Sequence, residues 1–360
     1  MKILHVSFAS ETGTNNGGKV FSLRNYHILQ KIYSPNNVKM YSVERTGNRN
    51  SLYWKISNFV SDNVNLQMNG LSNRHLKNIL DVINCNSIDI VFIDSSLLGQ
   101  VAKVCKKKYP KIKVITYFQN VEREFCKQMI IEEKKIQFIY RYYVAIYNEK
   151  MAVKYSDRFI ALNKRDISGL NYYYGINVPY MIPISIEDRY SPYKPKAVSR
   201  PLQLLFIGSY FYANVHAINF FITEVLPFVD AHLTLIGSNL EKLDVTNNDK
   251  LTIVPNAPDL SLYFQSADIV VLPIFKGSGM KTKTCEAMMF GKYIIGTKEA
   301  FEGYEIDSSF ASVCNTAQEF INVINNIELS LNFCESARNQ YLNNYSFETV
   351  EQEFRQAFNF

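Results

Sequence analysis

The sequence lacks long apolar runs and paired cysteines, and each absence excludes a class of protein. No stretch approaches the roughly 20 apolar residues of a membrane-spanning helix, and the apolar run at the N-terminus is too short for a signal peptide. The six cysteines include no CxxC pair, which excludes a disulfide framework and a zinc site. We therefore expect a cytoplasmic protein with reduced thiols, either free in solution or at the inner face of the cell membrane.

Metal-ligand clusters and nucleic-acid motifs are also missing. The sequence has five histidines, no DxD triplet and no set of His, Asp and Glu at ligand spacing, so we expect no metal and no cofactor. The net charge of +6 suits an anionic substrate, but no recognition motif accompanies it, so we expect no nucleic-acid partner. The first glycine loop has no GxGxxG form, which argues against a bound dinucleotide.

What the sequence does contain is a repeated alternation of short apolar runs and amphipathic segments. A chain of 360 residues exceeds the usual size of a single core, so two domains are expected. The alternation stops between about 176 and 202, where five prolines crowd together, and then begins again. This pattern predicts an α/β protein with two Rossmann-like, doubly wound domains that face a cleft, at 1–185 and 200–346.

One segment of the second domain has the pattern of a phosphate-binding turn. The apolar strand IVVLPIF runs into a turn with Gly277 and Gly279, and a helix follows that carries Lys281, Lys283 and Glu286. Glycines let the backbone approach an anion, the amides at a helix start point at it, and lysines add charge. We expect a diphosphate there and a ribose at Glu286; an ordinary turn with solvated lysines is the alternative. Lys281 is preferred to Lys283, which is expected to point outward.

Other candidates follow predicted strands, because the carboxyl ends of parallel strands face the ligand crevice. In the second domain these are Gly208 and Ser209, Asn256 for the base, and Glu302 with Gly303 for the donor. For Asn256 a simple turn is the competing interpretation, and for Glu302 and Gly303 a turn or a cap. In the first domain, Gly17, Gly18 and Lys19 form a loop that either lines the cleft or only connects a strand to a helix.

Two more candidates follow a strand of the first domain, on the side of the expected cleft. Gln119 and Glu122 follow the strand KVITYF, and Glu122 is equally suited to cap the next helix. The same domain has a basic segment at 103–113 and an aromatic-rich helix around 138–147. These either dock the protein on an anionic membrane or are a solvated lysine face and a core helix.

The chain resembles the GT-B glycosyltransferases, in particular the large retaining family of bacterial polysaccharide and lipid-glycan enzymes. The segments that carry the resemblance are FIGSYFYANVHAINFFITEVLPFV and LTIVPNAPDLSLYFQSADIVVLPIFKGSGMKTKTCEAMMFGKYIIGTKEAFEGY. The resemblance implies a metal-independent transfer, with the activated sugar on the second domain and the acceptor on the first. It also implies that the last helix, at about 347–360, crosses back to the first domain. The donor-binding residues implied are Gly208, Ser209, Asn256, Gly277, Ser278, Gly279, Met280, Lys281, Thr282 and Glu286.

The sequence departs from the family at two positions. The family commonly has a glutamate near the donor sugar where this chain has Ser278, and often a histidine near the reaction centre where this chain has Gln119. The main hypothesis is a hexosyl- or related glycosyltransferase that moves a sugar from a nucleotide-diphosphate sugar to a glycan or lipid-linked acceptor. The resemblance implies transfer with retention, and we expect a role in the synthesis of cell-surface polysaccharide or glycoconjugate. The alternatives are a non-catalytic subunit that binds glycan or stabilises a partner enzyme, and a nucleotide-sugar epimerase.

Overall fold

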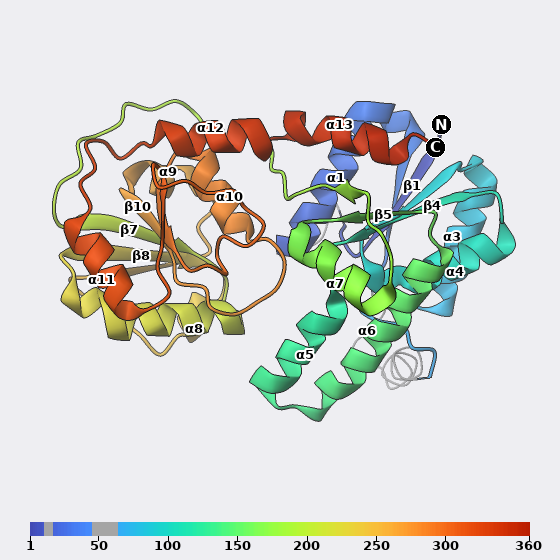
Figure 1. Cartoon of the computed structure of the whole chain (residues 1–360), viewed down its shortest axis with the longest axis horizontal. Helices are drawn as coiled ribbons and strands as arrows, with labels where there is room; N and C mark the ends of the chain where they lie inside the picture. Colours follow the sequence, from blue (N-terminus) through green and yellow to red (C-terminus); the bar gives the residue numbers. More distant parts are fainter. Residues whose placement is uncertain (11–16, 45–63) are drawn as a thin grey trace. The chain divides into compact units, whose positions relative to one another are not determined.

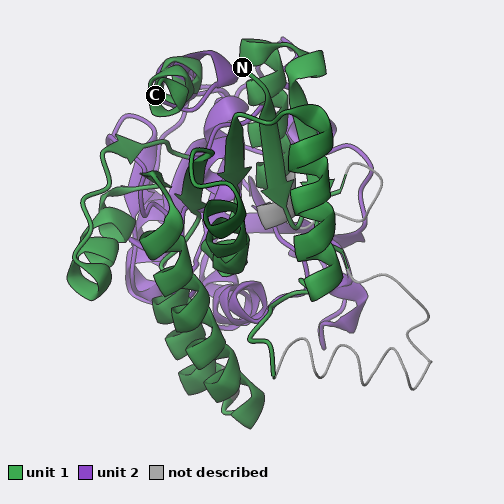
Figure 2. Cartoon of the chain, turned by 90° about the vertical axis from the view of Figure 1, so that its right-hand side faces the viewer, with its two compact units in different colours: residues 1–183, 350–360 green, residues 184–349 purple. Residues whose placement is uncertain are grey.

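The computed structural model describes residues 1–10, 17–44 and 64–360. The chain folds into two compact units, which Figure 2 colours separately. Unit 1 contains residues 1–183 together with 350–360, and unit 2 contains residues 184–349. In each unit, helices flank a sheet whose strands are all parallel (Figure 1). The predicted class, α/β with two Rossmann-like domains, is therefore confirmed.

The sheet of unit 1 has the strand order β2-β1-β3-β4-β5-β6. Its central strands are apolar and fully buried, as expected for a parallel sheet covered on both faces. β1 pairs with both β2 and β3, so the order of the strands reverses at β1 and β3. The strands are β1 (Ile3–Ser7), β2 (Val38–Ser42), β3 (Ile90–Ile93), β4 (Lys113–Phe118), β5 (Arg158–Ala161) and β6 (Tyr180–Met181).

Helices connect these strands, and the last helix of the chain joins the same unit. Two of them, α5 and α6, form a hairpin that projects from the sheet of unit 1 (Figure 1). The helices are α1 (Gly17–Tyr33), α3 (Asn73–Asn86), α4 (Gly99–Lys108), α5 (Glu122–Glu133), α6 (Ile136–Tyr155), α7 (Lys164–Tyr174) and α13 (Phe347–Phe358).

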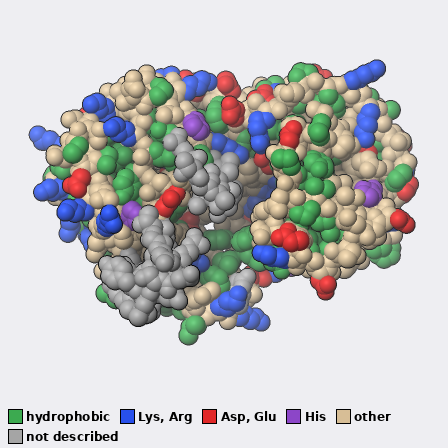
Figure 3. Space-filling model, turned by 180° about the vertical axis from the view of Figure 1, so that it is seen from behind, with side chains coloured by type: hydrophobic (Ala, Val, Ile, Leu, Met, Phe, Trp, Pro, Cys, Tyr) green, Lys and Arg blue, Asp and Glu red, His purple; other side chains and the backbone are tan. Residues whose placement is uncertain are grey.

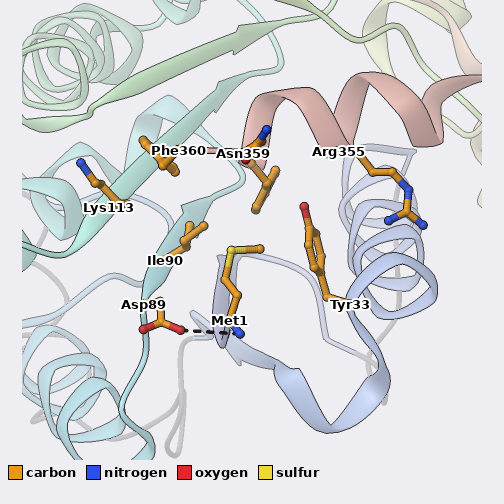
Figure 4. Close-up of a pocket in the computed structure, with 9 residues that line it drawn as sticks. Met1, Tyr33, Asp89, Ile90, Lys113, Arg355, Asn359 and Phe360 are labelled. Carbon is orange, nitrogen blue, oxygen red and sulfur yellow. Dashed lines mark ion pairs between the residues drawn. The ribbon is translucent and has the colours of Figure 1, made fainter.

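Helix α13 completes the apolar core of unit 1. The ring centroid of Phe358 lies 5.3 Å from that of Phe92, and the ring of Phe354 lies 6.4 Å from it. The guanidinium of Arg158 donates to the carbonyl oxygen of Ala357 at 2.9 Å. Beside α13, at the amino ends of β1, β3 and β4, is a cavity of about 470 Å³ that Figure 4 shows in close-up. The C-terminal end of the helix thus lies near the amino ends of the strands, away from their carboxyl ends.

The sheet of unit 2 has the order β12-β11-β10-β7-β8-β9. Its strands are β7 (Leu202–Ile207), β8 (Ala231–Gly237), β9 (Leu251–Pro255), β10 (Ile269–Leu272), β11 (Tyr293–Gly296) and β12 (Ala311–Val313). The order reverses between β7 and β10, which are neighbours. The helices are α8 (Tyr212–Phe220), α9 (Ser261–Ser266), α10 (Thr282–Met289), α11 (Ala317–Asn326) and α12 (Glu335–Asn344).

Two sequence expectations concern the whole chain. All six cysteines are free thiols. Among the helices of the described ranges, none combines the length and the apolar character that a membrane crossing requires.

Candidate functional site

The strand order of unit 2 places two predicted segments at one edge of its sheet. β7 and β10 are hydrogen-bonded neighbours, with Leu204 opposite Ile269 and Leu205 opposite Val270. In a doubly wound sheet, ligands bind outside the carboxyl ends of the strands where the order reverses. At that point lie the loop after β7, which begins at Gly208, and the loop from Pro273 to Lys281 after β10. The candidate site is built from these two loops.

The loop after β10 ends at a helix start suited to an anion. Gly277 and Gly279 have φ angles of 125° and 64°, in the region that glycine adopts without a steric cost. Lys281 is the N-cap residue of α10, and its side chain makes no capping hydrogen bond. The N–H of Thr284 donates to the carbonyl oxygen of Lys281 at 3.0 Å, whereas the Lys281 side chain caps neither of the first two N–H groups of α10, and the helix dipole adds positive potential there.

Lys283 is the positive group that points into this site. Its ammonium group donates to the side-chain oxygen of Asn214 at 2.7 Å and lies 4.5 Å from the centroid of the Phe206 ring. Burial lowers the pKa of Lys283 to about 7; the charge of Lys281 lowers it further, whereas Glu286 raises it. The expectation that Lys283 points outward is wrong, because its side chain reaches back to the loop after β7. An anion bound here would favour the charged form of this lysine.

The loop after β7 is held in place around that lysine. The N–H of Gly208 donates to the carbonyl oxygen of Ile236 at 2.8 Å, and the side-chain amide of Asn214 donates to the carbonyl oxygen of Ser209 at 2.8 Å. A Cβ atom at Gly208 would lie 2.9 Å from the Lys283 ammonium nitrogen. A side chain at this position would therefore displace the ends of the Asn214 and Lys283 side chains. The sequence analysis missed Asn214, although an amide at the start of the helix after β7 was the available signal.

Lys281 and Glu286 each have a charged partner within unit 2. Lys281 donates to a carboxylate oxygen of Glu299 at 2.7 Å and to the carbonyl oxygen of Gly279 at 2.7 Å. Glu286 accepts a hydrogen bond from Arg189 at 3.0 Å, and Arg189 is about half exposed. Sequence reasoning found neither Glu299 nor Arg189, because both pairings join separate segments. The assignments of Lys281 to diphosphate and Glu286 to ribose stay predictions.

The other predicted donor residues surround this centre at the same sheet edge or in the same loop. Ser278 is partly exposed, Met280 is buried, and Thr282 is the first residue of α10. Asn256 follows β9 in a left-handed conformation, and its N–H donates to the carbonyl oxygen of Gly237 at 3.2 Å. Glu302 and Gly303 lie in the turn that follows β11, where Gly303 has a φ of 82°.

In unit 1, Gln119 belongs to a polar network at the reversal point between β1 and β3. Its amide nitrogen donates to Ser22 at 3.0 Å and to a carboxylate oxygen of Asp94 at 3.0 Å. Asp94 follows β3, is buried, and also pairs with His5 at 2.9 Å. These bonds fix the orientation of the Gln119 amide, because only its nitrogen can donate to a carboxylate. The sequence did not single out Asp94 and His5, since nothing local marks a buried pair between two strands.

Glu122 lies in the interior of unit 1. Burial raises its pKa to about 8, and the nearby carboxylate of Glu149 raises it as well. Glu149, on α6, accepts the N–H of Glu122 at 2.7 Å and that of Arg123 at 3.3 Å, so Glu149 provides the cap of α5 that the sequence analysis considered for Glu122. Gly17 and Gly18 open α1, and the side chain of Lys19 lies outside the described residues.

Comparison with known proteins identifies the class. Residues 201–327 match the family model Glycosyl transferases group 1, and the match lies entirely within unit 2. The resemblance to the glycosyltransferases is thus confirmed, and within unit 2 these residues are similar to a domain of this family. No curated protein matches the sequence.

Solved structures give the same fold over almost the whole chain. Sucrose-phosphate synthase from Thermosynechococcus elongatus has a TM-score of 0.71 at 12% identity, covering 99% of this chain and 97% of that one. The lipopolysaccharide outer core galactosyltransferase WaaB has a TM-score of 0.68 at 13% identity, covering 99% of each chain. HepE from Anabaena, in complex with UDP and glucose, has a TM-score of 0.66 at 11% identity, covering 99% of this chain and 98% of that one.

Proposed function

We propose that the chain transfers a sugar from a nucleotide-diphosphate sugar to a glycan or lipid-linked acceptor, in the synthesis of cell-surface polysaccharide or glycoconjugate. The observation that carries this proposal is the position of Lys283. It is a partly buried lysine at the strand-order reversal of unit 2, near the amino end of α10, and its ammonium group donates to Asn214 at 2.7 Å. A diphosphate bound there would add to the negative charge of Glu286 and would favour the charged form of this lysine.

The proposal gives each part of the site a task. The backbone of Gly277 and Gly279 and the first amides of α10 hold the diphosphate, and Lys283 contributes the principal charge. Lys281 contributes a second charge that the carboxylate of Glu299 partly offsets. Glu286 accepts hydrogen bonds from the ribose hydroxyls. The partly exposed Ser278 lies next to the donor sugar.

These groups stabilise charge that develops during the transfer. As the bond between the sugar and the diphosphate breaks, negative charge grows on the departing oxygen, and preorganised amides and ammonium groups stabilise it. Orientation of the acceptor hydroxyl supplies much of the remaining rate enhancement. We propose that the transfer proceeds with retention and that lysines and helix amides neutralise the diphosphate in place of a metal ion.

The comparisons support this proposal at the level of the fold and of the family domain. Solved structures of HepE are described as complexes with UDP and with UDP-glucose, so a neighbour of the same fold binds a donor of this class. The family match covers β7 to β12, which contains both loops of the candidate site.

A panel of UDP-, GDP-, ADP- and TDP-sugars tests the donor site by thermal shift, because a ligand that binds the folded state raises its melting temperature. We expect one base to stabilise the protein and Lys283→Met to remove that stabilisation. Lys298→Met is the matched control, since Lys298 is an exposed lysine of the same unit. If no nucleotide-sugar stabilises the protein, or if Lys283→Met behaves like Lys298→Met, the donor site is elsewhere.

One observation favours a second candidate, a non-catalytic subunit that binds donor or glycan. The side chain of Gln119 is an amide bound to Asp94, and an amide cannot act as an acid or a base. Assays of donor hydrolysis and sugar transfer by the purified chain separate the two candidates. Turnover with any donor and acceptor pair supports the enzyme, and the anomeric proton of the product reports retention. Nucleotide binding without turnover across a broad panel supports the subunit.

A further inference from the structure

The far end of the α5–α6 hairpin exposes an apolar face. Ile136 is 84% exposed, Ile139 is 44% exposed and Tyr143 is 64% exposed. Residues three and seven positions apart lie on one side of a helix, so these three side chains share a face of α6. On α5, Ile131 is 62% exposed and lies near the same end of the hairpin. We call these four side chains the hairpin tip.

The opposite side of α6 already has its partners. Phe138, Val144, Ala145 and Ala152 are buried in unit 1. Helix α6 therefore has two apolar faces, one buried in unit 1 and one exposed. The exposed isoleucines do not belong to the core of unit 1. A monomeric protein rarely exposes contiguous apolar side chains without a partner for them.

Basic side chains flank the hairpin tip. Lys134 and Lys135 form the turn between the two helices, and Lys127 lies one helical turn before Ile131; all three are exposed. Residues 127–143 contain four basic residues (Lys127, Lys134, Lys135, Arg141) and two acidic ones (Glu132, Glu133), a net charge of +2. Apolar side chains ringed by lysines match the two layers of an anionic bilayer surface, its hydrocarbon boundary and its negative headgroups.

The size of the tip argues against a protein partner. A standard protein–protein interface uses about 20–30 residues on each side, whereas the tip offers four apolar side chains at the end of a projecting hairpin (Figure 1). A bilayer needs no complementary shape, so a narrow projection can insert into it. On the face shown in Figure 3, basic side chains occur on both units with acidic side chains among them. Charge alone therefore marks no docking surface on that face.

The basic segment at 103–113 is a weaker candidate for membrane contact. Lys106 donates to Asp157 at 2.8 Å and to the carbonyl oxygen of Ile112 at 2.7 Å. Lys103 donates to the Tyr147 hydroxyl at 3.2 Å. These two lysines have partners within unit 1, and among the described residues the segment has no exposed apolar face beside it like that of the hairpin, so we place the candidate surface on the hairpin.

We propose that the hairpin tip docks unit 1 on the surface of an anionic lipid bilayer. Ile131, Ile136, Ile139 and Tyr143 enter the boundary between headgroups and acyl chains, and Lys127, Lys134 and Lys135 contact the anionic headgroups. This docking does not require the donor site of unit 2. It can therefore hold or fail independently of the proposed sugar transfer.

Flotation of the full chain with vesicles tests the proposal. We expect binding to vesicles of phosphatidylglycerol and phosphatidylcholine, little binding to pure phosphatidylcholine, and weaker binding as salt is added. The double variant Ile136→Ser, Ile139→Ser should bind about tenfold or more weakly. Lys134→Gln, Lys135→Gln should bind about tenfold more weakly and lose part of the salt dependence.

Two control variants test whether the loss of vesicle binding is specific to the hairpin tip or follows from the loss of any exposed apolar or basic side chain. Leu262→Ser removes an apolar side chain that is 68% exposed in unit 2, and Lys107→Gln, Lys108→Gln removes two exposed lysines of α4. Both controls should bind vesicles like the wild type. Because every substituted side chain is exposed, all variants should keep the wild-type melting temperature.

Three results would overturn the proposal. One is an absence of vesicle binding by the wild type, and another is equal binding by the tip variants and the controls. The third is a tip variant that dissociates an oligomer, detected by light scattering, while vesicle binding is absent. That result would identify the tip as a contact between copies of this chain.

Discussion

Lys283 gives a prediction about the pH dependence of donor binding. In the free protein, burial lowers the pKa of Lys283 to about 7. A diphosphate beside the ammonium group stabilises the charged form and so raises the pKa of Lys283 in the complex. The affinity that this charge contributes is therefore fully present below about pH 7. It is lost as the pH rises from there towards the pKa in the complex.

The size of the effect follows from that shift. Between the two pKa values, binding must take up a proton, which costs about 1.36 kcal/mol for each pH unit and weakens binding about tenfold. From about pH 6.5 to about pH 8.5 the dissociation constant should rise on the order of tenfold or more. Lys283→Met should bind more weakly at the lower pH and lose this dependence. The ligand must be an intact nucleotide-sugar, because a terminal phosphate titrates near pH 6 by itself.

Titration calorimetry measures both quantities. Dissociation constants across the pH range give the slope, and titrations near pH 8 in buffers of different ionisation enthalpy give the number of protons taken up, which we expect to be about one. Lys298→Met is the control and should keep the slope of the wild type. A flat profile in the wild type, or an equal slope in Lys283→Met, would refute the placement of the diphosphate at this lysine.

Three further predictions concern other positions. Burial raises the pKa of Glu122 to about 8, so the folded state loses stability as the pH rises towards that value; Glu122→Gln should become more stable than the wild type as the pH increases, measured by urea unfolding near pH 5 and pH 9. A Cβ atom at Gly237 would lie 2.0 Å from the carbonyl oxygen of Gly208, so Gly237→Ala should lower the melting temperature. A Cβ atom at Gly208 would contact only the ends of side chains, so Gly208→Ala should mainly weaken donor binding, about tenfold. Phe354→Ala removes a fully buried ring that packs on Phe92 and should cost about 3–5 kcal/mol in the free energy of unfolding.

Each of these predictions has a control and a contradicting result. Glu132→Gln changes an exposed glutamate of the same helix, and a pH-independent difference between Glu122→Gln and the wild type would exclude the buried charge as the cause. Equal melting temperatures for the two glycine variants would contradict the backbone clash. Gln352→Ala, at an exposed position of α13, should leave stability unchanged, and a similarly small effect of Phe354→Ala would show that α13 is not part of the core.

The features that could be predicted from the sequence are those that depend on local sequence pattern. Apolar runs located the strands, and two glycines before an apolar helix located the turn at Gly277 and Gly279. In the segment FIGSYFYANVHAINFFITEVLPFV, α8 begins at Tyr212, and after Phe220 the chain continues as a π-helical turn and a short 3-10 turn. Pro227 lies in that last turn and has no N–H for a regular α-helical bond.

The details of the site could not be predicted, because they depend on contacts between distant segments. Lys283 meets Asn214 across 69 positions, and Gln119 meets Asp94 across 25. A lysine in a first helical turn has the same local sequence whether its side chain points to solvent or to a neighbouring loop. The position of the adjacent strand decides between them, and here the segment after β7 brings Asn214 close enough to accept a hydrogen bond from the ammonium group.

The packing of α13 on unit 1 affects the order in which the protein can form during translation. Unit 2 is encoded between the two parts of unit 1, so a ribosome makes all of residues 184–349 before it makes Phe354 and Phe358. Until then, Phe92 lacks the two rings that cover it. We therefore expect unit 2 to mature first, and unit 1 to remain partly open until residues 350–360 have been made.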